Sequence, residues 1–170
     1  MSNQNAEHLQ ALMRYTAWAN QVLYHALAGL DEELLARPRP GRLEGMLGVL
    51  GHIYVVGMIW KGHLTRQGHG FKTRSLEATP SLSILRQWQA ELDDWYLGFA
   101  CSLPPDRCRT PIDFLFVDGG AGRMTAEQML LHVSNHGTYH RGYIADMLYE
   151  AGTRPPTMDF PVFIRDGATG

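Results

Sequence analysis

Three histidines, His132, His136 and His140, recur at intervals of four residues in the last third of the chain. An α-helix turns once in about 3.6 residues, so this spacing stacks the three side chains along one side of a helix. Neutral imidazole is a common ligand of zinc, iron and nickel, and two imidazoles one turn apart can bind one metal ion without distorting the backbone. The same side carries Met129 and Ile144. The stretch therefore predicts half of a metal site on the apolar side of a helix.

A third ligand is predicted from a separate helical segment, residues 43–67. His52 shares its helical azimuth with the apolar residues Val49, Val56 and Ile59, so it is expected to point inward. Together with two histidines of the other helix, His52 completes a three-histidine site. The spacing alone leaves open whether those two are the first and second or the second and third of the row.

The sequence disfavours two other kinds of metal site. A zincin protease carries Glu directly after the first histidine of its pair, but Val133 and Gly137 occupy those positions. A di-iron bundle needs Glu three residues before His on paired helices, and the sequence contains no such spacing. Any chemistry is therefore expected to come from the metal ion and not from a base built into the motif.

Four amphipathic segments can hold these histidines in place. Each repeats apolar residues at intervals of three and four, and proline- or glycine-rich stretches separate them. Thr79 before Pro80 predicts the start of the third helix, and the capping box from Thr125 to Gln128 predicts the start of the fourth. The predicted helices are residues 5–30, 43–67, 79–101 and 125–151.

These segments predict an all-α, four-helix bundle with a long crossover between the third and fourth helices, in a single domain of residues 1–170. Residues 107–123 are β-prone and contain a glycine-rich turn, so a short β-hairpin is expected in that connection. The five glycines of the second helix predict close packing against a neighbour. The apolar tail, residues 157–165, is expected to fold back on the bundle.

Composition limits the classes of partner. The chain has 170 residues with 15 basic and 17 acidic side chains and a formal net charge of −2, which favours neither nucleic acid nor an anionic membrane. Its first residues have neither the basic nor the apolar region that is typical of a signal peptide, and no apolar run is long enough to span a bilayer, so a cytoplasmic location is expected. In a reducing compartment, Cys101 and Cys108 are expected to be free thiols.

Three motifs spread over the chain resemble those of one family. They are Tyr15-x-x-Trp18-Ala19-Asn20, then Leu50-Gly51-His52-Ile53-Tyr54, and His132-x-x-x-His136-x-x-Tyr139-His140-Arg141-Gly142. With them the chain resembles the DinB-like (DinB/YfiT) family of metal-dependent enzymes, over nearly its whole length. This family is unrelated to the DNA polymerase that shares the DinB name.

The resemblance implies a homodimeric four-helix bundle that binds one divalent metal ion through His52, His136 and His140. It leaves His132 beside the site, in contact with the ligands or the substrate, and Asn135, Tyr139 and Arg141 are weaker candidates for such contacts. Relatives of known activity include S-transferases that use low-molecular-weight thiols and a maleylpyruvate isomerase, and related domains occur in iron-dependent sulfoxide synthases. Many members have no known substrate.

The residues and the resemblance together give the leading hypothesis. A divalent ion, zinc first and nickel or iron as alternatives, activates a thiol or water for transfer to, or hydrolysis of, a small electrophile. The alternative from a different class is a noncatalytic, stress-associated homodimer that the metal stabilises. An iron-dependent, oxygenase-like activity ranks third.

Overall fold

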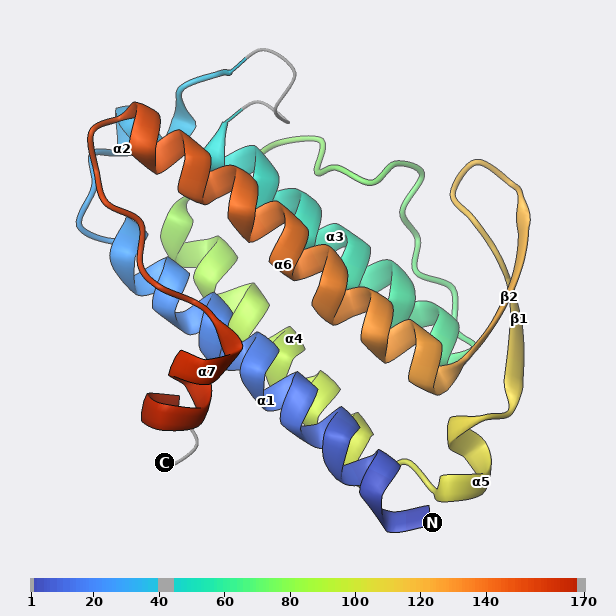
Figure 1. Cartoon of the computed structure of the whole chain (residues 1–170). Coiled ribbons are helices and arrows are strands. Elements are labelled where there is room, and N and C mark those ends of the chain that lie inside the picture. The colour runs from blue at the N-terminus through green and yellow to red at the C-terminus, as the bar shows by residue number, and fades with distance from the viewer. Residues whose placement is uncertain (1, 40–44, 168–170) are drawn as a thin grey trace.

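Four long helices form a bundle in the computed structural model, which describes residues 2–39 and 45–167 (Figure 1). This confirms the predicted all-α, four-helix fold. The predicted start of the second helix, at Leu43, lies outside the described residues. The long helices are α1 (Ser2–Leu27), α3 (Met46–Thr65), α4 (Leu82–Ser102) and α6 (Ala126–Glu150).

Each long helix packs against two others. α1 contacts α4 and α6, and α3 contacts the same two helices. Figure 1 shows that α3 and α4 run in the same direction, opposite to α1 and α6. The segment 66–81 therefore has to return along the length of α3 before α4 begins, and this returning segment covers the outside of α3 near His52.

The predicted hairpin is present in the connection between α4 and α6. A short helix, α5 (Pro105–Cys108), leads to strand β1 (Pro111–Leu115), which pairs with the antiparallel strand β2 (Ala121–Thr125). Thr125 ends β2 and caps α6. Its hydroxyl accepts from the Gln128 backbone N–H at 3.2 Å, while the Gln128 side chain accepts from the Thr125 N–H at 2.9 Å. The predicted capping box is confirmed.

Two details of the helix boundaries differ from prediction. Ser81 and not Thr79 is the residue before α4, because the first helical carbonyl bond joins Ser81 O to Leu85 N at 3.1 Å. A short helix, α2 (Glu32–Ala36), also follows α1. This short helix was not predicted, although Glu32 and Glu33 lie in its first turn, where acidic side chains favour a helix N-terminus.

Close packing of the glycine-rich helix α3 is confirmed. A Cβ atom built on Gly57 would lie 2.8 Å from Leu92 Cδ2 of α4, and one on Gly51 would lie 3.1 Å from Leu76 Cδ1 in the returning segment. The Tyr96 hydroxyl of α4 also donates to the Gly57 carbonyl at 2.6 Å. The absence of side chains at these positions lets α4 and the returning segment approach the backbone of α3.

The tail folds back on α1, as expected. It forms one helical turn, α7 (Phe160–Val162), and a wider π-type turn over Phe163–Gly167. The Tyr15 hydroxyl donates to the Met158 carbonyl at 3.0 Å, and Phe163 is buried against Tyr15 and Ala19. These contacts cover the outer side of α1.

The middle of the bundle is polar. Buried apolar side chains form one cluster around Met13, Leu92 and Leu130 and a second around Leu23 and Ile144. Buried polar side chains lie at the level between these clusters, and they are Thr16, Asn20, His52, Gln89, Asp93, Ser134, His140 and Arg141. Buried polar groups are costly unless they are paired, so this level is where a functional site is expected.

Candidate metal centre

His52 on α3 and His136 and His140 on α6 converge in the polar middle of the bundle. One ring nitrogen from each lies within 4.8 Å of the others. The Nε2 atoms of His52 and His136 are 3.1 Å apart. Two nitrogens bound to one tetrahedral ion at about 2.0–2.1 Å would be about 3.3 Å apart, so this separation suits ligands of a shared ion.

The orientation of His52 is set by the returning segment. Its Nδ1 lies 2.7 Å from the Arg74 carbonyl oxygen. A carbonyl only accepts, so Nδ1 carries the proton and Nε2 presents its lone pair toward His136. Metal-binding histidines typically have this arrangement, with the second nitrogen fixed by a backbone carbonyl.

Burial keeps the histidines neutral. Desolvation, followed by the neighbouring His140, His52 and His132, lowers the pKa of His136 to about 3. Desolvation and then His52 lower the pKa of His140 to about 4. Desolvation also lowers the pKa of His52, against the opposing effect of the Arg74 carbonyl. At neutral pH these imidazoles therefore hold lone pairs and not extra protons, which is the protonation state that metal binding needs.

The chemistry of the donor set fits a divalent transition metal. His140 Nδ1 is buried without a hydrogen-bond partner among residues 2–39 and 45–167, a costly condition for an imidazole nitrogen in the interior. Three neutral nitrogens suit zinc, nickel, iron and copper better than magnesium or calcium, which prefer oxygen ligands. The three-histidine cluster is thus compatible with metal binding, and the geometry alone does not select one of these metals.

His132 lies beside this cluster. Its ring packs on Trp60, with ring centroids 4.7 Å apart, and its centroid is 5.5 Å from that of His136. The side chain is half-buried, and desolvation lowers its pKa. Of the two pairs that the spacing left open, the structure brings the second and third histidines of the row together with His52. The contact of His132 with a ligand or substrate stays a prediction.

Two more of the predicted contact residues lie toward solvent. Tyr139 is 61% exposed, and its ring lies edge-on to His140 with centroids 5.1 Å apart. Its hydroxyl forms a hydrogen bond with that of Tyr143. Asn135 is also exposed. The outer side of α6 thus offers polar groups near the histidines, and the roles of Tyr139 and Asn135 stay predictions.

Arg141 lies in a buried network on the other side of α6. Its guanidinium donates to Asn20 Oδ1 at 2.8 Å and to Thr138 Oγ1 at 2.9 Å. The Asn20 amide donates to both carboxylate oxygens of Asp93, at 3.1 and 3.0 Å, and Gln89 donates to one of them at 2.9 Å. These bonds join α1, α4 and α6 on the inner side of the histidine cluster, where Asn20 and Asp93 line a small cavity together with His136.

Asp93 and Gln89 were not predicted to belong to the polar middle of the bundle. They lie one turn apart on the side of α4 that also buries Leu85, Leu92 and Tyr96. Polar residues with this spacing on an apolar face are a signal of a buried network, and that signal was available in the sequence. Their partner on α6 was not evident from the sequence.

A cavity of about 20 Å³ lies between His136 and the hydrogen-bond network of Asn20, Gln89 and Asp93. Gly137 also lines this cavity. That volume holds about one water molecule. The Gln89 Oε1 atom is buried with no partner in the described part of the chain, so it offers an acceptor for such a water. The inner side of the histidine cluster therefore has no room for an organic substrate.

Burial raises the pKa of Asp93 to about 6, against the opposing effects of Asn20, Gln89 and Arg141. The folded protein consequently binds this proton more tightly than the unfolded chain, and the contribution of Asp93 to stability falls as pH rises from about 4 to about 6. We expect Asp93→Asn, which does not titrate, to gain up to about 3 kcal/mol of unfolding free energy relative to the wild type between about pH 4 and pH 7.

Urea unfolding of both proteins across this pH range, with metal removed, measures the difference. The histidines titrate alike in the two proteins, so their effects cancel. A difference in unfolding free energy that stays constant from pH 4 to pH 7 would show that Asp93 is ionised with an ordinary pKa.

The remaining histidines lie outside the cluster. His8 and His25 are exposed. His63 packs against Trp60 and Phe114 at the end of the bundle. His69 is half-buried, because its ring packs beside His63 and its Nδ1 accepts from the Phe71 N–H at 3.1 Å.

Two other predictions can be compared with the structure. Cys101 is exposed, Cys108 is buried, and both are free thiols. None of the helices within residues 2–39 and 45–167 has the length and apolar character that a bilayer crossing requires.

Comparison with known proteins places the chain among relatives of one kind. The model of the DinB family matches residues 1–168. Protein DinB of Bacillus subtilis (strain 168) is 26% identical over 159 residues, which cover 90% of this chain and 91% of that protein. The crystal structure of a DinB-like protein from Bacillus cereus ATCC 10987 superposes with a TM-score of 0.60 at 18% identity, over 82% of this chain and 90% of the other. The last similarity concerns the fold alone.

Proposed function

Because the chain belongs to the DinB family, we propose that it is a metalloenzyme in which His52, His136 and His140 hold one divalent ion, with zinc as the first candidate. The observation that carries this proposal is the convergence of three neutral imidazole nitrogens within 4.8 Å. We propose that the reaction is transfer of a thiol, or addition of water, to a small electrophile.

When bound, such an ion keeps its full charge and a position for a further ligand, so it lowers the pKa of a thiol or water that binds there. The protein contributes orientation. The Arg74 carbonyl fixes the tautomer of His52, and burial keeps the imidazoles of His136 and His140 neutral at neutral pH, so that each ring has one nitrogen with a free lone pair.

The substrate is expected to approach from the outer side of α6. The inner cavity beside His136 holds no more than about one water. On the outer side, Tyr139 and Asn135 are exposed and His132 is half-buried beside His136. We propose that His132, neutral because burial lowers its pKa, accepts the proton that the thiol or water releases.

A thiol-transfer assay tests this function. L-Cysteine and monochlorobimane are the probes: the cysteine sulfur forms a bond to carbon, chloride leaves, and the thiol proton passes to His132 and then to buffer. We expect the zinc-loaded protein to react at least about tenfold faster than the metal-free protein, within the range that general acid–base and metal assistance provide. Hydrolysis of 4-nitrophenyl acetate tests water as the nucleophile in the same way.

His132→Asn separates the proton acceptor from the ligands. This variant is expected to keep one metal ion per chain and to lose about tenfold or more in rate. Equal rates with both probes for the metal-loaded and metal-free proteins, together with a large loss of melting temperature on chelation, would contradict the enzyme proposal and favour a noncatalytic role for the metal.

A further inference from the structure

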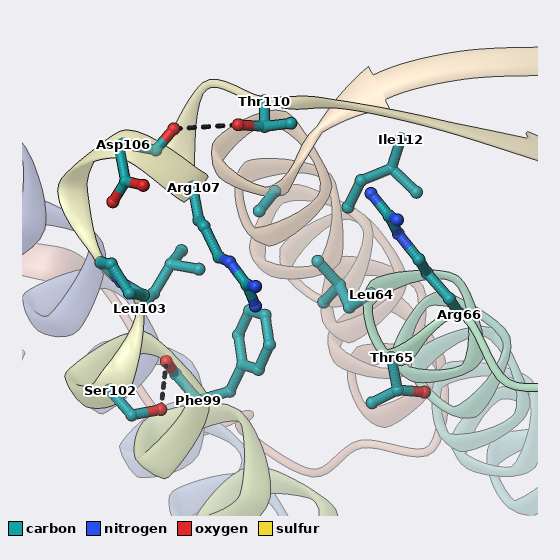
Figure 2. A pocket seen from close by; sticks show the side chains of 12 residues that line it. Leu64, Thr65, Arg66, Phe99, Ser102, Leu103, Asp106, Arg107, Thr110 and Ile112 are labelled. Carbon is teal, nitrogen blue, oxygen red and sulfur yellow. Dashed lines mark hydrogen bonds between the residues drawn. The ribbon is translucent and has the colours of Figure 1, made fainter.

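The structure has a second candidate ligand site, at the end of the bundle away from the tail. A cavity of about 680 Å³ lies where α3 and α4 end, and α5, β1 and the first residue of α6 complete its wall (Figure 2). We propose that this cavity binds a small organic anion, a carboxylate or phosphate attached to an apolar body, through the guanidinium groups of Arg66 and Arg107.

This cavity is separate from the histidine cluster. Ala126 lines it, and His136 lies ten residues further along α6. At about 1.5 Å per residue, the two positions are about 15 Å apart along the helix axis. A ligand of ordinary size in the cavity would therefore not reach the metal ligands, and the proposal does not depend on the function proposed above.

Two arginines from different elements supply the positive charge. Arg66 follows α3 and Arg107 belongs to α5, and Figure 2 shows the Arg107 side chain extending from α5 into the space between the ends of α3 and α4. Within residues 2–39 and 45–167, neither guanidinium takes part in an ion pair. Guanidinium groups bind carboxylates and phosphates through paired N–H bonds, so two of them without counterions favour one anion between them.

The other charged groups nearby leave this positive charge largely uncompensated. Asp106 is exposed at the rim, and its backbone carbonyl accepts from the Thr110 hydroxyl at 2.9 Å. Arg109 and Glu127 pair with each other at 3.8 Å. Asp113, which lines a neighbouring hollow with Arg66, pairs with Arg123 at 3.6 Å. Among the described residues that line the cavity itself, Asp106 is the one carboxylate beside the two guanidinium groups.

The backbone of Arg66 provides a second, independent observation. Its φ of 56° and ψ of 31° lie in the left-handed region, and it is the one non-glycine residue with positive φ among the residues described. Glycine or asparagine is usual at this position after a helix, because a Cβ atom is disfavoured there. The positive charge interacts favourably with the end of α3, but a lysine or arginine one residue earlier would do the same without strain. Figure 2 shows the Arg66 side chain extending from the end of α3 toward Ile112, at the wall of the cavity.

The apolar walls of the cavity favour an anion that has an apolar body. Leu64, Phe99, Leu103 and Ile112 line the cavity, and the Arg107 side chain extends toward the Phe99 ring in Figure 2. A volume of about 680 Å³ lies within the usual range for organic ligands and is much larger than one phosphate ion needs. The combination suits an anion with an aromatic or aliphatic body that packs on Phe99 and the leucines.

Isothermal titration of the metal-loaded, full-length protein with phenyl phosphate tests the proposal. We expect one site with a Kd of about 1 mM or tighter, and binding of inorganic phosphate at least about tenfold weaker, because it lacks the apolar body. Phenylacetate in place of phenyl phosphate shows which head group the arginines prefer. Arg66→Gln and Arg107→Gln are each expected to weaken binding about tenfold or more, the usual effect of losing a charged hydrogen-bond pair.

Matched variants locate the site. Arg86→Gln, at an exposed position of α4 outside the cavity, is expected to bind phenyl phosphate like the wild type. Arg66→Gly is expected to lose binding without any fall in melting temperature, because glycine relieves the strain at positive φ. No binding at about 5 mM, unchanged binding in the Arg66→Gln/Arg107→Gln double variant, or an equal loss of binding in Arg86→Gln would each overturn the proposal.

Discussion

Replacing His136 with alanine is expected to lower the affinity of the protein for zinc at least about a hundredfold. This loss exceeds the usual effect of replacing a residue that only hydrogen-bonds to a metal ligand. His136 is in contact with both other ligands of the proposed site: its Nε2 lies 3.1 Å from that of His52, and its ring centroid is 4.4 Å from that of His140. Removing it leaves two nitrogens, too few for the ordinary coordination of zinc in proteins.

Elemental analysis of untagged protein after dialysis against a weak chelator measures the effect. We expect about one ion per chain in the wild type and less than about a tenth of an ion in His136→Ala, with the same result for His52→Ala. His25→Ala, which removes an exposed histidine of α1, is the control and should retain its metal. Equal metal content in all four proteins would show that the ion binds elsewhere.

Arg141→Ala is expected to have the largest effect on folding, a loss of about 3–5 kcal/mol in the free energy of unfolding. Arg141 is only 2% exposed, and its charge opposes the burial cost of Asp93. Removing it leaves a buried carboxylate without a nearby cation, and Asn20 Oδ1 loses its donor. For a chain of this size, such a loss lowers the melting temperature by about 10 °C or more.

Urea unfolding followed by circular dichroism at pH 7 tests this prediction. Arg14→Ala, at an exposed position of α1, is the control and should change stability by no more than about 0.5 kcal/mol. In the double variant Arg141→Ala/Asp93→Asn, part of the loss should be recovered, because the carboxylate no longer needs a cation. If Arg141→Ala alone is as stable as the wild type, Arg141 does not stabilise the buried network.

Local patterns in the sequence predicted the four long helices. The repeat of apolar residues and the capping box at Thr125 each involve residues within one or two helical turns of one another, so both can be recognised from the sequence alone. The spacing of His136 and His140 placed both rings on one side of α6 for the same reason. The inward direction of His52 followed from its apolar neighbours on α3.

Contacts between distant segments were not predictable in this way. An amphipathic repeat shows which side of a helix is buried, but it does not show in which direction the helix runs relative to its neighbours. The sequence therefore did not predict that α3 and α4 run in the same direction and that residues 66–81 return along the bundle. The Arg74 carbonyl that orients His52 lies in this returning segment. The pairing of Arg141 with Asn20 and Asp93 likewise depends on how three helices meet.

Anomalous diffraction from crystals of the zinc-loaded protein, measured on both sides of the zinc absorption edge, tests the central claim most directly. We predict one peak per chain, at about 2.0–2.2 Å from a ring nitrogen of each of His52, His136 and His140, with a further ligand position taken by water. A peak at any other place in the chain, or a zinc ion with four protein ligands and no water, would contradict the proposed catalytic metal centre.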